Sequence, residues 1–297
     1  MPDASRFARA PQQAAAAAPS NEIVVNRERE MQTAEDIKVT LPSEAELARG
    51  FKEKYYRDGQ PGWSPLLRER FGHYTPDDYY ETLVGQLILP GSTWADIGCG
   101  RDIFPQNPVL ASQLASRCSY VFGIDPDDNV RENKMIQGYF QGLVEDCDTT
   151  REFDLVTLRM VAEHIVNPEA AMARIKKLLR PGGHVVIYTP YKWAPMSVIA
   201  SAVPFGLHNP LKRLIWDSDA RDTFPTAYKL NTHRDQLRHT GAVGLSESLY
   251  VELDDCRTLA AFRWLNTLEL GLQRMLRRAS MHYPERCILG VYRRAPE

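Results

Sequence analysis

The stretch Ala95-Asp96-Ile97-Gly98-Cys99-Gly100-Arg101-Asp102 decides the fold. It joins an apolar run over 94–97, which predicts a buried strand, to a helical pattern over 107–117. Gly98 permits a tight turn, and Gly100 lets a ligand come close to the backbone. Such a turn after a parallel strand is where nucleotide-like ligands bind. Taken alone, the two glycines are also compatible with an ordinary strand-to-helix turn.

Strands and helices alternate around this turn. Further apolar runs predict strands over 120–124, 153–158 and 185–189, and a helical pattern over 168–179 lies between the last two. Alternation of this kind implies crossover connections and a parallel sheet with helices on both faces. We therefore predict an α/β fold with at least four parallel strands. Later elements are expected over 233–240 (helix), 245–253 (strand), 257–279 (helix) and 287–292 (strand).

Asp125 favours one class of ligand for the glycine turn. It follows the second predicted strand, where a carboxylate can accept both hydroxyls of a ribose. A dinucleotide site requires a third glycine at the position of Ile103, to complete G-x-G-x-x-G. S-adenosylmethionine carries a ribose and an adenine but no phosphate. The pair Gly98 and Gly100, together with Asp125, fits this ligand better than a dinucleotide.

Five motifs in the expected order carry a resemblance to a known family. They are Asp96–Gly100, Gly123–Asp125, Phe153–Val156, Glu163–Pro168 and Leu179–Gly183. The chain resembles the class I S-adenosylmethionine-dependent methyltransferases, in the branch of small-molecule enzymes related to ubiquinone biosynthesis. The resemblance implies a Rossmann-like sheet of seven mostly parallel strands, with helices on both faces and a lid insertion. It also implies S-adenosyl-L-methionine as the cofactor.

The resemblance assigns roles by position. It places the methionine and ribose side of the cofactor against Asp96, Gly98, Cys99 and Gly100. It places the ribose hydroxyls at Asp125 and Pro126, the adenine at Val144 and Glu145, and the methionine moiety at Arg159 and Met160. Two positions depart from the family pattern. Asp102 stands where a third glycine is common, and Leu143 stands where an acid often reaches the adenine amine.

His164, expected in the helix after the third predicted strand, is the candidate catalytic residue. Methyl transfer to a hydroxyl is helped by a base that removes its proton, and histidine is the usual choice. The alternative is that Glu163 and His164 serve only the local structure. Quinone O-methyltransferases that bind a metal have an acid at the position of Met160, so no metal site is predicted. The further candidate bases are His73, His208 and His233.

Composition restricts the class of partner. Lys plus Arg total 36 against 38 for Asp plus Glu, which gives a net charge of −2 and no overall basic excess for nucleic acid. The five cysteines form no Cys-x-x-Cys pair, which favours reduced thiols in a cytoplasmic protein. We expect a small-molecule acceptor, and the oligomeric state stays open. Less favoured alternatives are an RNA or protein methyltransferase, suggested by C-terminal arginines, and a non-catalytic binding module.

The predicted organisation has four parts. A disordered tail over 1–40 precedes a methyltransferase core over 41–191, whose first helices cover the sheet. A proline-interrupted lid follows over 192–230, and residues 231–297 complete the core. The apolar side chains of the lid are expected to pack on the sheet, and contact with a membrane surface is the less favoured alternative. The helix over 257–279 is amphipathic, with Leu259, Phe262, Leu265, Leu268, Leu272 and Met275 on one face.

Overall fold

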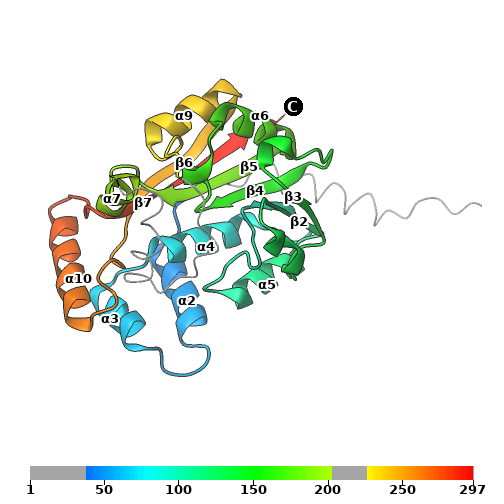
Figure 1. The fold of residues 1–297 in the computed structure, drawn as a ribbon. Coiled ribbons are helices and arrows are strands. Elements are labelled where there is room, and N and C mark those ends of the chain that lie inside the picture. The colour runs from blue at the N-terminus through cyan, green and yellow to red at the C-terminus, as the bar shows by residue number, and fades with distance from the viewer. Residues whose placement is uncertain (1–37, 203–225, 297) are drawn as a thin grey trace, which may run out of the picture. The chain divides into compact units, whose positions relative to one another are not determined.

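The computed structural model describes residues 38–202 and 226–296 (Figure 1). Almost all of the predicted tail lies outside these residues, as does much of the predicted lid. The described residues of the predicted lid are 192–202, which include helix α7 (Pro195–Ala202), and 226–230. Within the described residues, no helix has the length and apolar character needed to cross a lipid bilayer.

A seven-stranded sheet forms the centre of the described fold, as predicted. Its strand order is β3-β2-β1-β4-β5-β7-β6. All neighbouring strands from β3 to β5 are parallel, whereas β7 runs antiparallel to both β5 and β6. The strands are β1 (Thr93–Ile97), β2 (Tyr120–Asp125), β3 (Gly138–Gln141), β4 (Phe153–Arg159), β5 (Leu179–Pro190), β6 (Leu245–Asp254) and β7 (Arg286–Arg294).

The strand order reverses at β1, and we call the region at the carboxyl ends of β1, β2 and β4 the crevice. From the central strand β1 the chain first proceeds outward through β2 and β3, and it then returns to β4 on the other side of β1. In open parallel sheets, ligands bind at the carboxyl ends of the strands where the order reverses in this way. The register pairs Asp96 of β1 with Gly123 of β2 and with Thr157 of β4. The residues that follow β1, β2 and β4 therefore lie close together, at the carboxyl ends of these strands.

Helices cover both faces of the sheet. Figure 1 shows α6 and α9 on one face and α4 and α5 on the other. The first face is closed by Ala171, Met172, Ile175 and Leu178 of α6, all buried in the main apolar cluster. The helices are α2 (Glu44–Tyr55), α3 (Trp63–Phe71), α4 (Pro76–Leu87), α5 (Pro108–Arg117), α6 (Pro168–Leu178), α9 (His233–Ala242) and α10 (Arg263–Arg278).

Aromatic side chains fill the second face. Tyr80 of α4 stacks on Tyr188 of β5, with ring centroids 5.1 Å apart, and both side chains are fully buried. Phe104 lies edge-on to Tyr80 and also contacts Trp94 of β1. This packing fixes α4 against the strand ends, which matters because α4 carries an acidic side chain of the candidate site.

Most of the predicted elements are confirmed, and the differences are local. The capping box of Ser43 starts α2, and Thr75 caps α4 with Pro76 in its first turn. The predictions missed α3 and β3, which are short. His164 does not lie in a helix of several turns: it ends η3 (Ala162–His164), a single 3-10 turn. Two further 3-10 turns are η1 (Asp128–Glu132) and η2 (Val144–Asp146).

Helix α10 is amphipathic as predicted, but its apolar face points outward. Its buried residues are mostly polar: Asn266, Glu269, Leu270 and Gln273. The large apolar side chains at Trp264, Leu268, Leu272 and Met275 are exposed. This reverses the usual arrangement of a surface helix, in which the apolar stripe faces the core.

Candidate cofactor-binding and catalytic site

The turn after β1 has the glycine geometry that the sequence suggests. Gly98 has φ +75°, and its N–H donates to Ile124 O of β2 at 2.7 Å. A Cβ at this position would lie 2.1 Å from Cγ2 of Val161, so a side chain is excluded by contact as well as by conformation. Gly100 also has positive φ, +44°. The turn thus requires glycine at Gly98 for two separate physical reasons.

Asp125 and the turn are joined directly. The Gly100 N–H donates to Asp125 Oδ2 at 2.8 Å, and the Asp127 N–H donates to Asp125 Oδ1, also at 2.8 Å. The carboxylate is almost entirely buried at the end of β2, whereas Pro126 beside it is exposed. Charged hydrogen bonds of this kind hold a carboxylate in one orientation. Two backbone segments therefore aim the Asp125 carboxylate at the crevice edge.

Asn133 holds the turn from the other side, and the sequence analysis missed it. Its amide Nδ2 donates to Cys99 O at 3.2 Å and to Gly100 O at 3.1 Å. Cys99 is buried, and its side chain is directed at Gly123 of β2. No local sequence pattern indicates this contact, because Asn133 lies 33 residues after Gly100.

Asp96 is a buried acid next to the turn. It is almost fully buried, and the Thr157 hydroxyl donates to its Oδ1 at 2.5 Å. Burial raises the pKa of Asp96 to about 7, although the Thr157 hydrogen bond and the charge of Arg159 oppose the shift. Because of this pKa, Asp96 changes its charge near neutral pH.

The predicted adenine side lies alongside Asp125. The Gly142 N–H, just after β3, donates to Asp125 O at 3.0 Å, which brings the start of η2 next to the crevice. Val144 is buried in the apolar cluster, while Leu143 is half exposed. The Asp146 N–H is bonded to Leu143 O within the turn. The exposed Leu143 therefore occupies the position where the family often has an acid, and the partly buried Glu145 follows Val144 in η2.

Arg159 belongs to a buried charge cluster that the sequence did not suggest. Its Nε and Nη2 donate to Oδ1 of Asp77, in the first turn of α4, at 3.1 and 2.8 Å. Arg257 bonds the other oxygen of Asp77 and also forms a double contact with Asp255 at 2.6 and 2.7 Å. Burial opposes ionisation of Asp77, but Arg257 and Arg159 outweigh it and lower its pKa to about 2.

Met160 follows Arg159 in a strained backbone conformation. Its φ is +53°, which is uncommon for a residue with a side chain, and its N–H donates to Tyr188 O at 2.8 Å. The hydrogen bond to β5 holds this conformation in place. Strained backbone of this kind concentrates at functional sites, and here it directs the chain away from β4 at the crevice edge.

Glu163 and His164 differ in their surroundings. Glu163 is buried and accepts a hydrogen bond from the Thr189 hydroxyl at 2.7 Å, and the Asn231 amide donates to the same hydroxyl at 2.7 Å. The Glu163 carbonyl accepts the N–H of Tyr228 at 3.1 Å. His164 is half buried on the same turn. Glu163 therefore joins η3 to β5 and to the segment around Tyr228, and His164 is the more accessible neighbour.

The other candidate bases are less well placed. His73 is buried, and burial together with the nearby Arg68 charge lowers its pKa to about 4. His233 lies on α9, where its Nε2 contacts Glu247 Oε2 at 2.7 Å and its ring stacks on Tyr250. His208 lies outside the described residues. Within 38–202 and 226–296, no three His, Cys, Asp or Glu side chains form a group suited to a metal ion.

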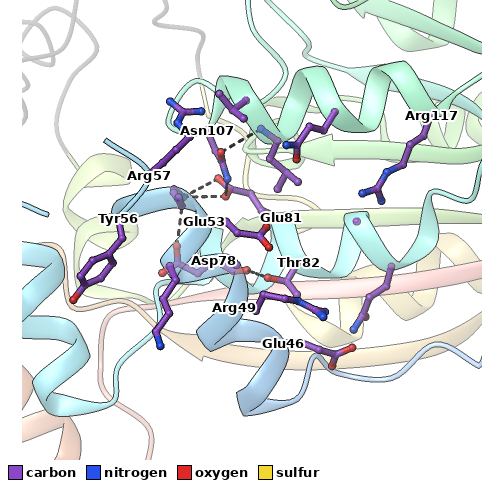
Figure 2. Close-up of a pocket in the computed structure, with 18 residues that line it drawn as sticks. Glu46, Arg49, Glu53, Tyr56, Arg57, Asp78, Glu81, Thr82, Asn107 and Arg117 are labelled. Atoms are coloured by element: carbon purple, nitrogen blue, oxygen red, sulfur yellow. Dashed lines mark hydrogen bonds and ion pairs between the residues drawn. The ribbon is translucent and has the colours of Figure 1, made fainter. Parts of the chain in front are cut away.

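A cavity of about 700 Å³ lies away from the glycine turn, between α2, α4 and α5 (Figure 2). Charged and polar side chains line it, and Lys54, Asp78, Glu81 and Asn107 among them bond to one another. Lys54 Nζ lies 2.9 Å from Glu81 Oε1, and the Asn107 amide donates to Glu81 Oε2 at 2.8 Å. Because these groups satisfy each other, we interpret the cluster as an attachment of α2 and α5 to α4 rather than as a ligand site.

Comparison with known proteins identifies the family. A family model described as a methyltransferase domain matches residues 67–243. The chain belongs to this methyltransferase family. Membership confirms the predicted enzyme class, and it supports S-adenosylmethionine as the cofactor of that class.

Relatives of this methyltransferase match only part of its length. Among curated proteins, the ubiquinone biosynthesis O-methyltransferase of Vibrio atlanticus (strain LGP32) is 30% identical over 119 residues, which is 37% of this chain and 45% of the relative. The protein of the same name from Aeromonas salmonicida (strain A449) is 33% identical over 117 residues, 36% of this chain and 44% of the relative. The chain thus spans about half the length of the curated relatives it matches.

Solved structures resemble this methyltransferase at low sequence identity. The N-methyltransferase NodS from Bradyrhizobium japonicum WM9 is 16% identical, with a TM-score of 0.42, and the match covers 75% of this chain and 97% of that one. A Haloferax volcanii methyltransferase activator complex, Trm112 with a putative methyltransferase, gives 13% identity and a TM-score of 0.49 over 79% of this chain and 95% of the matched one.

Proposed function

We propose that this methyltransferase transfers the methyl group of S-adenosylmethionine to a hydroxyl oxygen of a small molecule. The observation that carries the proposal is the bond between the Gly100 N–H and the Asp125 carboxylate, at the carboxyl ends of β1 and β2. This bond links two features. One is a glycine turn that a ligand can approach closely, and the other is a carboxylate that can accept hydrogen bonds from a ribose diol.

The residues at the crevice fit this cofactor. A carboxylate oxygen accepts more than one hydrogen bond, so Asp125 can accept ribose hydroxyls while it retains Gly100. The exposed Leu143 side chain can contact an adenine face, and Asp96 lies buried beside the glycine turn. The bound cofactor supplies a methyl group that its sulfonium charge already activates. The chain's own task is to bind and align, which is worth several kcal/mol in such reactions.

His164 is proposed to take the proton of the acceptor hydroxyl on a ring nitrogen. It stands on η3, directly after β4 and Met160, at the edge of the sheet that also holds the glycine turn. Its position is set by the buried carboxylate of Glu163, which is bonded to Thr189. The names of the curated relatives, which are O-methyltransferases, favour an oxygen acceptor over a nitrogen acceptor.

The acceptor atom can be tested with two matched probes. The full chain is incubated with S-adenosylmethionine carrying a tritiated methyl group and with either 3,4-dihydroxybenzoate or 3,4-diaminobenzoate. We expect transfer to the dihydroxy compound only. Transfer to the diamine alone, or to neither probe when the chain binds S-adenosylhomocysteine, would contradict a hydroxyl acceptor of this class.

The role of His164 has its own test. His164→Ala is expected to lower kcat about a hundredfold, the usual effect of removing a general base. His239→Ala, on the half-buried face of α9, is the matched control and should leave kcat unchanged. An unaltered kcat in His164→Ala would show that this residue serves the local structure only.

A further inference from the structure

Helix α10 presents an apolar stripe to solvent. Trp264, Leu268, Leu272 and Met275 recur at i, i+4, i+8 and i+11, so they lie along one side of the helix. Trp264 is 66% exposed, Leu268 64% and Met275 60%. Phe262 and Met281, just before and after the helix, are also exposed and extend this apolar surface. A continuous exposed stripe of large apolar side chains marks a binding surface.

The orientation of α10 is fixed by its polar face. The Asn266 amide donates to Cys256 O at 2.8 Å, and the Gln273 amide donates to Asp254 Oδ2 at 2.8 Å. Glu269 Oε2 accepts the Leu259 N–H at 3.2 Å. All three side chains are buried. Rotating the helix to bury the stripe would break these bonds, so the outward position of the stripe belongs to the folded state.

Positive charge borders the stripe along one side. On a helical projection Arg263, Arg274 and Arg278 follow one another next to Trp264, and all three are exposed. None of them forms an ion pair with another described residue. The one acid of the helix, Glu269, faces the interior. The outer surface of α10 is therefore apolar along its centre and cationic along its border.

We propose that α10 docks in the plane of an anionic lipid surface. An apolar stripe with a tryptophan enters the boundary between headgroups and acyl chains, and bordering arginines pair with anionic headgroups. A second copy of the chain fits less well, because two such surfaces brought together would place like charges near each other. RNA would use the arginines but not the apolar stripe. The inference rests on α10 alone and is independent of the proposed function.

Vesicle binding by the full chain tests this assignment. Co-sedimentation is measured with vesicles of phosphatidylcholine alone and of phosphatidylcholine with 30% phosphatidylglycerol. We expect binding to the anionic vesicles, weaker binding to the neutral ones, and loss of the difference in 0.5 M NaCl. Absence of binding to the anionic vesicles would overturn the proposal.

Two pairs of variants separate charge from apolar contact. Arg274→Gln/Arg278→Gln should weaken binding to anionic vesicles about thirtyfold, at roughly fivefold per arginine. Arg234→Gln/Arg238→Gln has the same spacing on the exposed side of α9 and should bind like the unaltered chain. Leu268→Gln/Met275→Gln should weaken binding at least about tenfold, whereas Leu237→Gln on α9, also exposed, should not.

Other results would reassign the surface. Equal loss in the α9 variants would show that binding is a general charge effect and would overturn the proposal. Self-association that Leu268→Gln/Met275→Gln abolishes, with no vesicle binding, would identify a second copy as the occupant. Binding of RNA that requires Arg274 and Arg278 but not Leu268 and Met275 would point to nucleic acid. Because these side chains are exposed, the variants should melt at the temperature of the unaltered chain, which confirms that they fold.

Discussion

The crevice at the ends of β1 and β2 and the charge cluster at the end of β4 differ in construction. The crevice is built from backbone groups, the Asp125 carboxylate and the Asn133 amide, all from residues close to the glycine turn and to the second strand. The cluster joins side chains from distant segments: Asp77 of α4, Arg159 of β4 and Arg257 after β6. The crevice therefore depends on local backbone shape, and the cluster depends on the tertiary packing of three elements.

This difference predicts how each region responds to change. A methyl group added to the crevice should meet fixed atoms and have a large effect on folding. Removal of a charge from the cluster should leave unmatched charges behind. Titration of Asp96, the buried acid between the two regions, should change the free energy of unfolding by less than these substitutions do, and the change should depend on pH.

The largest effect is expected for Gly98→Ala. The substitution adds left-handed strain at φ +75° and a Cβ 2.1 Å from Val161 Cγ2, and together these should lower the free energy of unfolding by about 4 kcal/mol. Gly72→Ala is the matched control, because Gly72 has φ +62° but nothing within 4 Å of its Cβ, so it should lose only about 1 kcal/mol. Urea denaturation measures both. Equal losses in the two variants, or no recovery in Gly98→Ala/Val161→Ala, would contradict the close contact.

Asp77→Ala comes next. It leaves Arg159 and Arg257 without their shared carboxylate and should cost about 3 kcal/mol of stability, at the low end for a broken buried pair because both arginines are partly exposed. Asp58→Ala, at an exposed carboxylate on the surface, should have almost no effect. Thermal and urea unfolding provide the measurement. A stability equal to that of the unaltered chain would show that the cluster contributes nothing net.

The lowered pKa of Asp77 also predicts that the free energy of unfolding depends on pH. Its pKa is lowered in the folded state, so its ionised form stabilises the fold above about pH 4, and this contribution is lost as the pH falls toward about 2. The difference in unfolding free energy between the unaltered chain and Asp77→Asn should therefore shrink over this range. A constant difference from pH 5 to pH 2 would contradict the assignment.

Asp96 should give the opposite dependence on pH. Its folded-state pKa is raised to about 7, so the folded chain holds a proton that the unfolded chain has released, and stability falls as the pH rises from about 4 through 7. Relative to Asp96→Asn, the unaltered chain should lose about 2 kcal/mol of unfolding free energy between pH 5 and pH 8. Parallel curves for the two chains would show that Asp96 is ionised throughout.

Helices α6 and α10 show what sequence periodicity can and cannot predict. Both have an apolar face at helical spacing, and both were predicted as helices. In α6 the apolar face, with Ile175 and Leu178, is buried. In α10 the apolar face is exposed, because Asn266 and Gln273 on the other side bond to buried partners. Periodicity indicates a helix, but the face that is buried depends on partners from elsewhere in the fold.

The candidate site likewise has features that the sequence could predict and features that it could not. The glycine turn and Asp125 were predictable, because a few adjacent residues determine their conformation. The contributions of Asp77, Asn133 and Arg257 were not, because each acts on a residue distant in the chain. A sequence pattern records local spacing and carries no sign of such long-range bonds.

The central claim is that Asp125 and the glycine turn bind the cofactor, and calorimetry with S-adenosylhomocysteine tests it most directly. The unaltered chain should bind. Asp125→Ala should weaken binding about a hundredfold, since it removes charged hydrogen bonds to the ribose, and Asp128→Ala, at an exposed acid three residues later, should not. No binding to the unaltered chain, or equal affinity in the unaltered chain and Asp125→Ala, would contradict the account.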